Sequence, residues 1–179
     1  ATFKRAIRQH FYHIKFDLIL YSTPPITLLS AVNYAKIKNN AHTYLLLKDI
    51  FPQNAVDLGM LSTSGPKAII YKYFKNKEKH LYRISDYIGC MSQANVDYLI
   101  KHNPQIPSNS IEVCPNSMEP SRKIFSEHEK EQIRLKYNLP TDKTLFLYGG
   151  NLGKPQGIEF LIECIKANNS NDNAYFIIA

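Results

Sequence analysis

A glycine-rich turn carries the clearest chemical signal in this sequence. Residues 149–157 read GGNLGKPQG and separate an apolar run, 144–148, from a segment with helical periodicity. Glycine lets backbone approach a ligand closely, and the free N–H groups that begin a helix attract phosphate. The spacing fits neither the dinucleotide fingerprint nor the P-loop, because Pro155 stands where a Ser or Thr would follow the lysine. The segment therefore predicts either a phosphate site or a tight turn without a ligand.

A second polar segment follows an earlier apolar run. Residues 48–54 read KDIFPQN, and they come directly after a predicted buried strand, 44–47. The carboxylate of Asp49 and the amide of Asn54 could bind sugar hydroxyls, and a carboxylate can also serve acid/base chemistry. Asp before a proline-containing turn is equally a common turn residue. Both interpretations stay open from these residues alone.

A predicted helix over 66–84 is strongly basic. It carries six cations against a single acid, Glu78, and its apolar residues can share one face. This pattern indicates a membrane-surface or polyanion-binding helix, or only a solvated face. Nucleic acid is the least favoured partner, because no nucleic-acid-binding motif accompanies the charge. The six cations are Lys67, Lys72, Lys75, Lys77, Lys79 and Arg83.

Composition limits the remaining chemistry. The net charge is +7 over 179 residues, and three cysteines, Cys90, Cys114 and Cys164, form no CxxC pair. We expect buried free thiols in a reducing compartment. The six histidines form no recognisable ligand cluster, so we predict no metal and no cofactor. No nucleophile–histidine arrangement can be assembled, so the catalytic residues are unassigned. No apolar run is long enough to span a membrane, and no secretion signal is visible.

Helical segments alternate with short apolar strands along the whole chain. Continuous apolar strands alternating with helices predict an α/β fold whose parallel sheets are covered by helices on both faces. In such sheets ligands bind beyond the carboxyl ends of the strands. Predicted strands are 16–21, 44–47, 86–91, 111–114, 144–148 and 174–178. Predicted helices are 2–13, 25–37, 66–84, 92–100, 126–137 and 156–167, and 115–121 reads as a linker.

Five segments in order resemble one enzyme family. They are STPP at 22–25, LKDIFPQNAVDLGML at 47–61, SDYIGCMSQANVDYL at 85–99, CPNSMEP at 114–120 and GGNLGKPQG at 149–157. Together they resemble the group 1 (family 4) retaining glycosyltransferases, in particular the bacterial enzymes that add amino sugars during capsule and O-antigen assembly. The chain departs from the family at Ser117, where a glycine is usual, and at Asn151, where several members have a phosphate-binding arginine. Gln156 stands where many members have lysine.

The resemblance implies a GT-B architecture of two Rossmann-like domains. Residues 1–121 would be the later part of the N-terminal acceptor-side domain plus the linker, and residues 122–179 the beginning of the nucleotide-sugar-binding domain. The chain would lack both ends of the family's length and would be inactive alone. The implied reaction moves a hexose, which we expect to be an amino sugar, from a nucleotide diphosphate to a lipid-linked acceptor in capsular polysaccharide or lipopolysaccharide synthesis.

The resemblance also assigns roles to residues. Asp49, Asn54 and Ser22 would bind the acceptor, and Lys72, Lys75, Lys79 and Arg83 would face an anionic membrane. The donor phosphates would lie against Gly150, Asn151, Gly153, Lys154, Gln156 and Gly157. The protein would be cytoplasmic and peripheral at the inner face of the cell membrane. Two alternatives remain: a non-catalytic folded piece that pairs with itself, and a sugar-nucleotide epimerase of the same fold.

Overall fold

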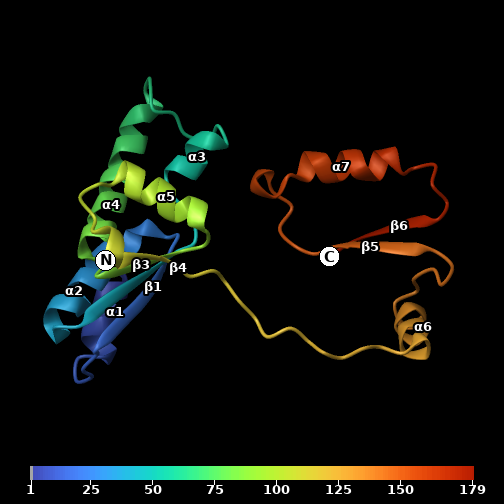
Figure 1. Cartoon of the computed structure of the whole chain (residues 1–179), viewed down its shortest axis with the longest axis horizontal. Coiled ribbons are helices and arrows are strands. Elements are labelled where there is room, and N and C mark those ends of the chain that lie inside the picture. The colour runs from blue at the N-terminus through green and yellow to red at the C-terminus, as the bar shows by residue number, and fades with distance from the viewer. Residues whose placement is uncertain (1) are drawn as a thin grey trace. The chain divides into compact units, whose positions relative to one another are not determined.

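The structure, a computed structural model, describes residues 2–179 and divides into two compact units (Figure 1). The first runs to Met118 and the second is Glu119–Ala179. Each contains parallel strands flanked by helices, which confirms the predicted α/β class. Whether the two units correspond to the acceptor and donor domains stays a prediction.

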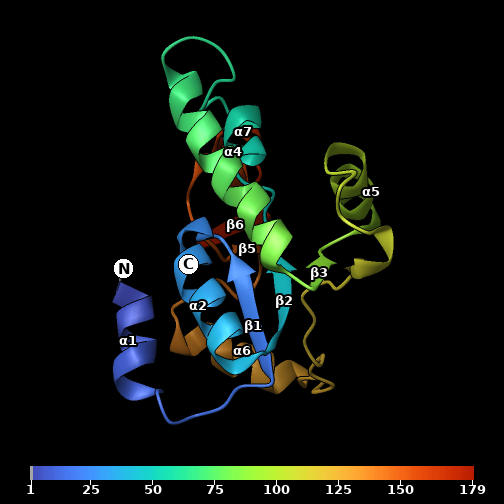
Figure 2. The ribbon, with the colours of Figure 1, turned by 90° about the vertical axis from the view of Figure 1, so that its left-hand side faces the viewer.

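The first unit is built on a four-stranded parallel sheet with the strand order β1-β2-β3-β4. Figure 2 shows β1, β2 and β3 side by side, with β1 at the edge. Pairing is in register over the whole of β1 and β2, from Leu18 opposite His42 to Thr23 opposite Leu47. The elements are α1 (Thr2–His10), β1 (Leu18–Thr23), η1 (Ile26–Leu28), α2 (Leu29–Asn39), β2 (His42–Leu47), α3 (Gln53–Asp57), α4 (Lys67–Ile84), β3 (Tyr87–Cys90), α5 (Gln93–His102), η2 (Ser108–Ser110) and β4 (Ile111–Val113).

The hydrophobic core of this unit lies on one face of the sheet. Alternate strand residues point to opposite faces, so each strand sends every second side chain into the core. The helices α2, α4 and α5 cover that face and add one or more buried side chains each. The core includes Tyr21, Val32, Leu45, Leu47, Leu81, Ile88, Cys90, Val96, Leu99 and Ile111.

The other face of the sheet is largely open, which differs from the expected two-sided cover. Leu18, Leu20 and Tyr87 are all more than half exposed there. The strand order explains the difference: crossovers between parallel strands are right-handed, so strands added in one direction place their helices on one face. A helix layer on the second face needs a reversal of strand order. The sheet of residues 2–118 contains no such reversal.

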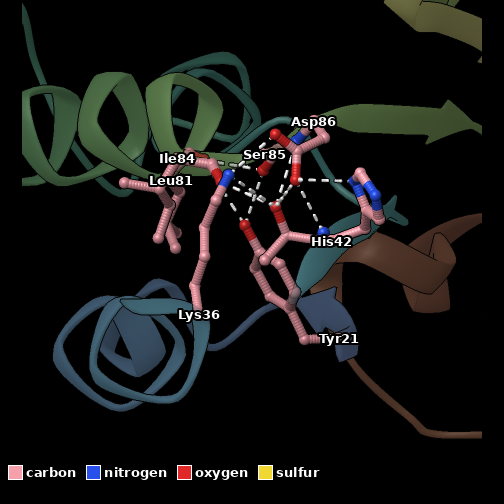
Figure 3. Close-up of polar contacts among 8 residues, drawn as sticks. Tyr21, Lys36, His42, Leu81, Ile84, Ser85 and Asp86 are labelled. Atoms are coloured by element: carbon pink, nitrogen blue, oxygen red, sulfur yellow. Dashed lines mark hydrogen bonds and ion pairs between the residues drawn. The ribbon is translucent and has the colours of Figure 1, made fainter. Parts of the chain in front are cut away.

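A polar cluster lies near the start of β2 and β3 and links these strands to α2 and α4 (Figure 3). The Asp86 carboxylate accepts hydrogen bonds from Lys36 Nζ (2.8 Å) and from the backbone N–H of Thr43 (2.8 Å). Burial alone would raise the pKa of Asp86, but these bonds together lower it. The Tyr21 hydroxyl lies 2.6 Å from Ser85 Oγ, and burial raises the pKa of Tyr21 to about 12. Because the donors and acceptors of this cluster form hydrogen bonds with one another, the cluster stabilises the packing of α2 and α4 on the sheet.

The second unit is a smaller strand–helix–strand arrangement. Its elements are α6 (Glu127–Lys136), β5 (Thr144–Tyr148), η3 (Lys154–Gln156), α7 (Ile158–Ala167) and β6 (Ala174–Ile178). The strands β5 and β6 pair in parallel from Thr144 opposite Ala174 to Tyr148 opposite Ile178. None of its residues is fully buried. An apolar hollow of about 400 Å³ also remains, lined by side chains of β5, β6 and α7 such as Phe146, Leu161 and Phe176.

Local sequence signals account for several helix boundaries. Ser126 and Glu129 form the predicted capping box at the start of α6, because each side chain bonds the other's backbone N–H. Ser92 caps α5 as predicted, accepting from the N–H of Asn95. The short helix α3 was not predicted, since Gln53–Asp57 is too brief to display a helical period. Within residues 2–179, no helix is both long and apolar enough to cross a membrane.

Candidate functional site

The glycine-rich turn leaves the carboxyl end of β5 and enters α7. Its first residues are exposed, and η3 then makes a single 3-10 turn before Gly157. Gly157 is the N-cap of α7 with φ 69° and ψ 42°, a left-handed conformation that costs an L-residue energy and suits glycine. The Tyr148 hydroxyl donates to the Asn151 carbonyl at 2.8 Å, which holds the turn against the end of its strand.

The first backbone amides of this turn have no protein acceptor among the described residues. In the described chain, the N–H groups of residues 149–154 make no hydrogen bond to backbone or side chain. The first N–H with a partner is that of Gln156, which donates to the Gly153 carbonyl at 3.0 Å, and Gly157 donates to Lys154 O at 3.1 Å. Six consecutive donors without a protein partner, five of them on exposed residues, lie close to a helix N-terminus and form a concentration of positive potential suited to an anion.

Side chains of the turn modulate that potential. Lys154 is exposed and has no ion pair among the described residues, so its ammonium is available to an anionic ligand. Asn151 and Gln156 are also exposed and carry amide donors. Glu159 lies in the first turn of α7, where its carboxylate is stabilised by the helix but opposes an incoming anion. The predicted donor-phosphate residues are thus contiguous and accessible, while their role stays a prediction.

A second candidate site lies at the carboxyl edge of the first unit's sheet. A pocket of about 360 Å³ opens beyond β2, between α3 and the start of α5. Asp49 and Asn54, both predicted from the sequence, line this pocket together. Its lining residues are Lys48, Asp49, Ile50, Gln53, Asn54, Asp57, Ala94, Asn95 and Tyr98.

The lining of this edge pocket is mostly polar. It offers two carboxylates and three amides, and the Oδ1 atom of Asn54 is buried without a hydrogen-bond partner. Gln53 Nε2 donates to Asp57 Oδ1 at 2.8 Å, which fixes one side of the rim. A buried acceptor without a partner is costly.

Three polar lining residues were missed from the sequence. Asp57 comes from the unpredicted α3, and Asn95 and Tyr98 come from one face of α5. The Tyr98 ring stacks on His102 with centroids 4.0 Å apart, and burial raises the pKa of its hydroxyl. An aromatic ring beside amides and carboxylates is typical of sugar sites. The i,i+3 spacing of Asn95 and Tyr98 was the signal available in the sequence.

Ser22, the third predicted acceptor residue, does not line the edge pocket. It lies on β1 and, by strand alternation, on the open face with Leu18 and Leu20. Its neighbour Thr23 points to the core face, where its Oγ1 is buried without a partner. The structure therefore brings Asp49 and Asn54 together and leaves Ser22 apart from them.

The basic helix α4 divides its cations into two kinds. Lys72, Lys79 and Arg83 are exposed. Lys75 is different: its side chain is 19% exposed and its Nζ lies 2.5 Å from Glu78 Oε2. Glu78 is only 2% exposed, and burial raises its pKa although Lys75 and the Tyr82 hydroxyl oppose that shift. Lys75 therefore neutralises a buried carboxylate, and its charge does not face outward.

The described residues contain no group of three or more potential metal ligands. All three cysteines are free. Cys90 is buried in the core, and burial raises the pKa of its thiol to about 11, which makes it unreactive.

Compared with known proteins, the chain matches no family model. It is 23% identical over 164 residues to a Pseudomonas aeruginosa protein named probable glycosyltransferase WbjE. The chain is similar to a glycosyltransferase. The alignment covers 90% of this chain and 39% of that relative, so the chain spans about two fifths of the relative's length. Because the alignment is longer than either unit, the similarity extends into both.

Proposed function

We propose that this chain is part of a glycosyltransferase that moves a sugar from a nucleoside diphosphate to an acceptor. The observation that carries the proposal is the row of unbonded amides at 149–154, set between a parallel strand and a helix N-terminus. The similarity to a protein named as a glycosyltransferase supports the same conclusion independently.

The proposed chemistry is electrostatic. As the bond from sugar to diphosphate breaks, negative charge develops on the leaving phosphate oxygens. Preformed N–H donors and the Lys154 ammonium stabilise that charge without reorganising at the moment of reaction. If the departing phosphate also takes the proton of the acceptor hydroxyl, no protein nucleophile is required.

The acceptor is proposed to bind in the edge pocket of the first unit. Asp49, Asn54 and Asp57 supply oxygen acceptors for sugar hydroxyls, and Tyr98 supplies an aromatic surface. The lining contains one cation, Lys48, against the two carboxylates, so an uncharged or amino-bearing sugar suits it better than an acidic one. This selectivity agrees with the amino-sugar enzymes that the sequence resembles.

Further details of the proposal come from the family resemblance. They are a hexosyl donor, retention of anomeric configuration, and a lipid-linked acceptor used in capsular polysaccharide or lipopolysaccharide synthesis. The protein would work in the cytoplasm in peripheral contact with an anionic membrane. Because the chain spans only part of its relative's length, we propose that it binds nucleotide without turning it over alone.

Calorimetric titration of the chain with UDP tests the proposal. We expect saturable binding that Lys154→Gln weakens by roughly 10- to 100-fold, since a charge-assisted hydrogen bond contributes roughly 1.5–3 kcal/mol. Lys101→Gln, an exposed lysine on α5, is the matched control and should leave the affinity unchanged. Equal affinity of the two variants, or no binding at all, would favour the non-catalytic alternative.

A further inference from the structure

A pocket at the amino ends of the strands lies on the opposite edge of the sheet from the edge pocket. Ser85 and Asp86, which directly precede β3, and Ser110, which directly precedes β4, all belong to its lining. The last turns of α4 and the loop between α5 and β4 form its walls. Its volume is about 290 Å³, at the lower end of ordinary ligand sites, so it suits a small ligand. We name it the amino-end pocket.

Two cations line the amino-end pocket from one face of α4. Lys79 and Arg83 are four residues apart, which places them about 40° from each other around the helix. Both are exposed, and neither forms an ion pair within residues 2–179. Gln105, on the loop between α5 and β4, is also exposed and adds the N–H donors of its amide. The pocket therefore offers two positive charges and an amide to a ligand.

The acid in the lining does not cancel these charges. Both oxygens of the Asp86 carboxylate are occupied, since Oδ1 accepts from Lys36 Nζ at 2.8 Å and Oδ2 accepts from the backbone N–H of Thr43 at 2.8 Å (Figure 3). Lys36 also forms an ion pair with Asp86, and that pair is neutral as a whole. The two cations of α4 are therefore left without a counterion.

The carboxyl end of a helix normally repels an anion, because its free carbonyls carry partial negative charge. At the end of α4 two of these carbonyls already have donors. Leu81 O accepts from Ser85 Oγ at 2.7 Å, and Ile84 O accepts from Lys36 Nζ at 2.8 Å. An anion in the amino-end pocket would therefore meet carbonyls that are already hydrogen-bonded, which weakens their opposition to the cations.

We propose that the amino-end pocket binds a dianionic phosphate, either inorganic phosphate or the phosphate group of a small soluble monoester. A phosphomonoester carries about two negative charges at neutral pH, which matches the two cations without a counterion. The planar guanidinium of Arg83 can donate to two phosphate oxygens at once, and the ammonium of Lys79 adds a compact charge. This site goes beyond the proposed function and does not depend on it, because neither the edge pocket nor the glycine-rich turn shares a residue with it.

Titration of the whole chain with inorganic phosphate, followed by NMR of the backbone amides, tests the site. We expect saturable shifts at Gln105, Ile106 and Ser110. Arg83→Gln should weaken binding by about tenfold, the low end for a charge-assisted hydrogen bond, because Arg83 is exposed. Lys72→Gln is the matched control, since it removes an exposed charge of the same helix outside the pocket and should leave the affinity unchanged. Equal losses in the two variants, or no shift in the 105–110 loop, would overturn the proposal.

A conservative variant separates specific recognition from charge. Arg83→Lys keeps the positive charge but loses the planar fork, so its affinity should lie between those of the wild type and Arg83→Gln. Bound phosphate should also raise the Tm of the wild type more than that of Arg83→Gln, because a ligand stabilises the folded state that binds it. Equal rises in Tm at matched ionic strength would contradict a site at Arg83.

Two further arms identify the source of the phosphate and its place. Glycerol 3-phosphate should shift the same amides as inorganic phosphate, whereas binding only to vesicles that contain phosphatidic acid would contradict a soluble ligand. Phosphate that shifts residues 149–157 and leaves the 105–110 loop unchanged would also overturn the amino-end pocket, while the proposed function would stand. Conversely, shifts at 105–110 with phosphate and none anywhere with UDP would support this pocket and count against the nucleotide site.

Discussion

The two units of this protein share a strand–helix pattern but differ in how their positions are held. In the first, Leu45, Ile88 and Leu99 are completely buried beneath three helices. In the second, no residue is fully buried, and Leu147 on β5 is 69% exposed. The edge pocket therefore stands on a packed core, whereas the glycine-rich turn stands on one strand pair and one helix.

The difference teaches that a binding motif and a rigid site are separate properties. The turn at 149–157 has accessible donors, but only the Tyr148–Asn151 bond and the left-handed Gly157 hold its shape. The edge pocket is lined by α3 and by α5, and α5 packs on the sheet through the buried Val96 and Leu99. We expect ligand binding to order the turn more than the pocket.

The largest expected difference in unfolding free energy comes from replacing a strand leucine with alanine in each unit. Leu45→Ala removes a completely buried side chain from β2 and should lower the free energy of unfolding by about 2–5 kcal/mol. Leu147→Ala, at an exposed position of β5, should change it by less than about 1 kcal/mol. Urea denaturation followed by circular dichroism measures both. Similar losses for the two variants would mean that the second unit has a comparable core.

A smaller difference in stability is expected between two ion pairs whose partners are three residues apart on a helix. Lys75→Gln leaves buried Glu78 without its cation and should cost about 1–3 kcal/mol at neutral pH. Lys130→Gln removes the exposed pair with Glu127 in the second unit and should have no measurable effect. Thermal unfolding of both variants makes the comparison.

The pH dependence of the Lys75→Gln variant has a definite sign. Burial raises the pKa of Glu78 in the folded state above its ordinary value, and loss of Lys75 raises it further. The folded state then holds a proton that the unfolded state releases, so stability is highest below the unfolded pKa and falls as pH rises through the folded pKa. The deficit of Lys75→Gln should shrink on acidification. A deficit that grows at low pH would contradict a buried Glu78.

The smallest expected effect compares two left-handed glycines. Gly65 in the first unit and Gly157 in the second have φ of 65° and 69°, and an added Cβ would meet no atom within 4 Å at either position. Gly→Ala should therefore cost about 1–2 kcal/mol of backbone strain at both. Hydrogen exchange should show local opening after Gly157→Ala, because no core resists it, while the first unit stays protected after Gly65→Ala. Equal increases in hydrogen exchange after the two substitutions would contradict the proposed difference in packing between the units.

The sequence predicted elements whose signals are local. The strands Thr144–Tyr148 and Ala174–Ile178 and the Ser126–Glu129 capping box were confirmed, because apolar runs and caps need no tertiary information. The five-residue helix Gln53–Asp57 was missed because it is shorter than two turns. Helix cover on one face of the sheet was also missed, since it depends on strand order, which composition does not reveal.

The candidate sites were predictable only in part for similar reasons. Asp49 and Asn54 could be placed at a strand's carboxyl end, but Tyr98 reaches the same pocket only through the packing of α5. Lys75 and Glu78 are three residues apart in the sequence, yet which of the helix's cations faces inward depends on the core beneath it. The roles of these residues in binding stay predictions.

The most direct test of the central claim is to observe the glycine amides themselves. Labelling with 15N-glycine gives seven signals, four from residues 149, 150, 153 and 157 and three controls from Gly59, Gly65 and Gly89. On addition of UDP, the account predicts that the signals of the glycine-rich turn shift, most strongly Gly149, Gly150 and Gly153, whose N–H groups have no protein partner. Saturable shifts confined to the first-unit glycines, or none at millimolar UDP, would contradict a diphosphate site at this turn.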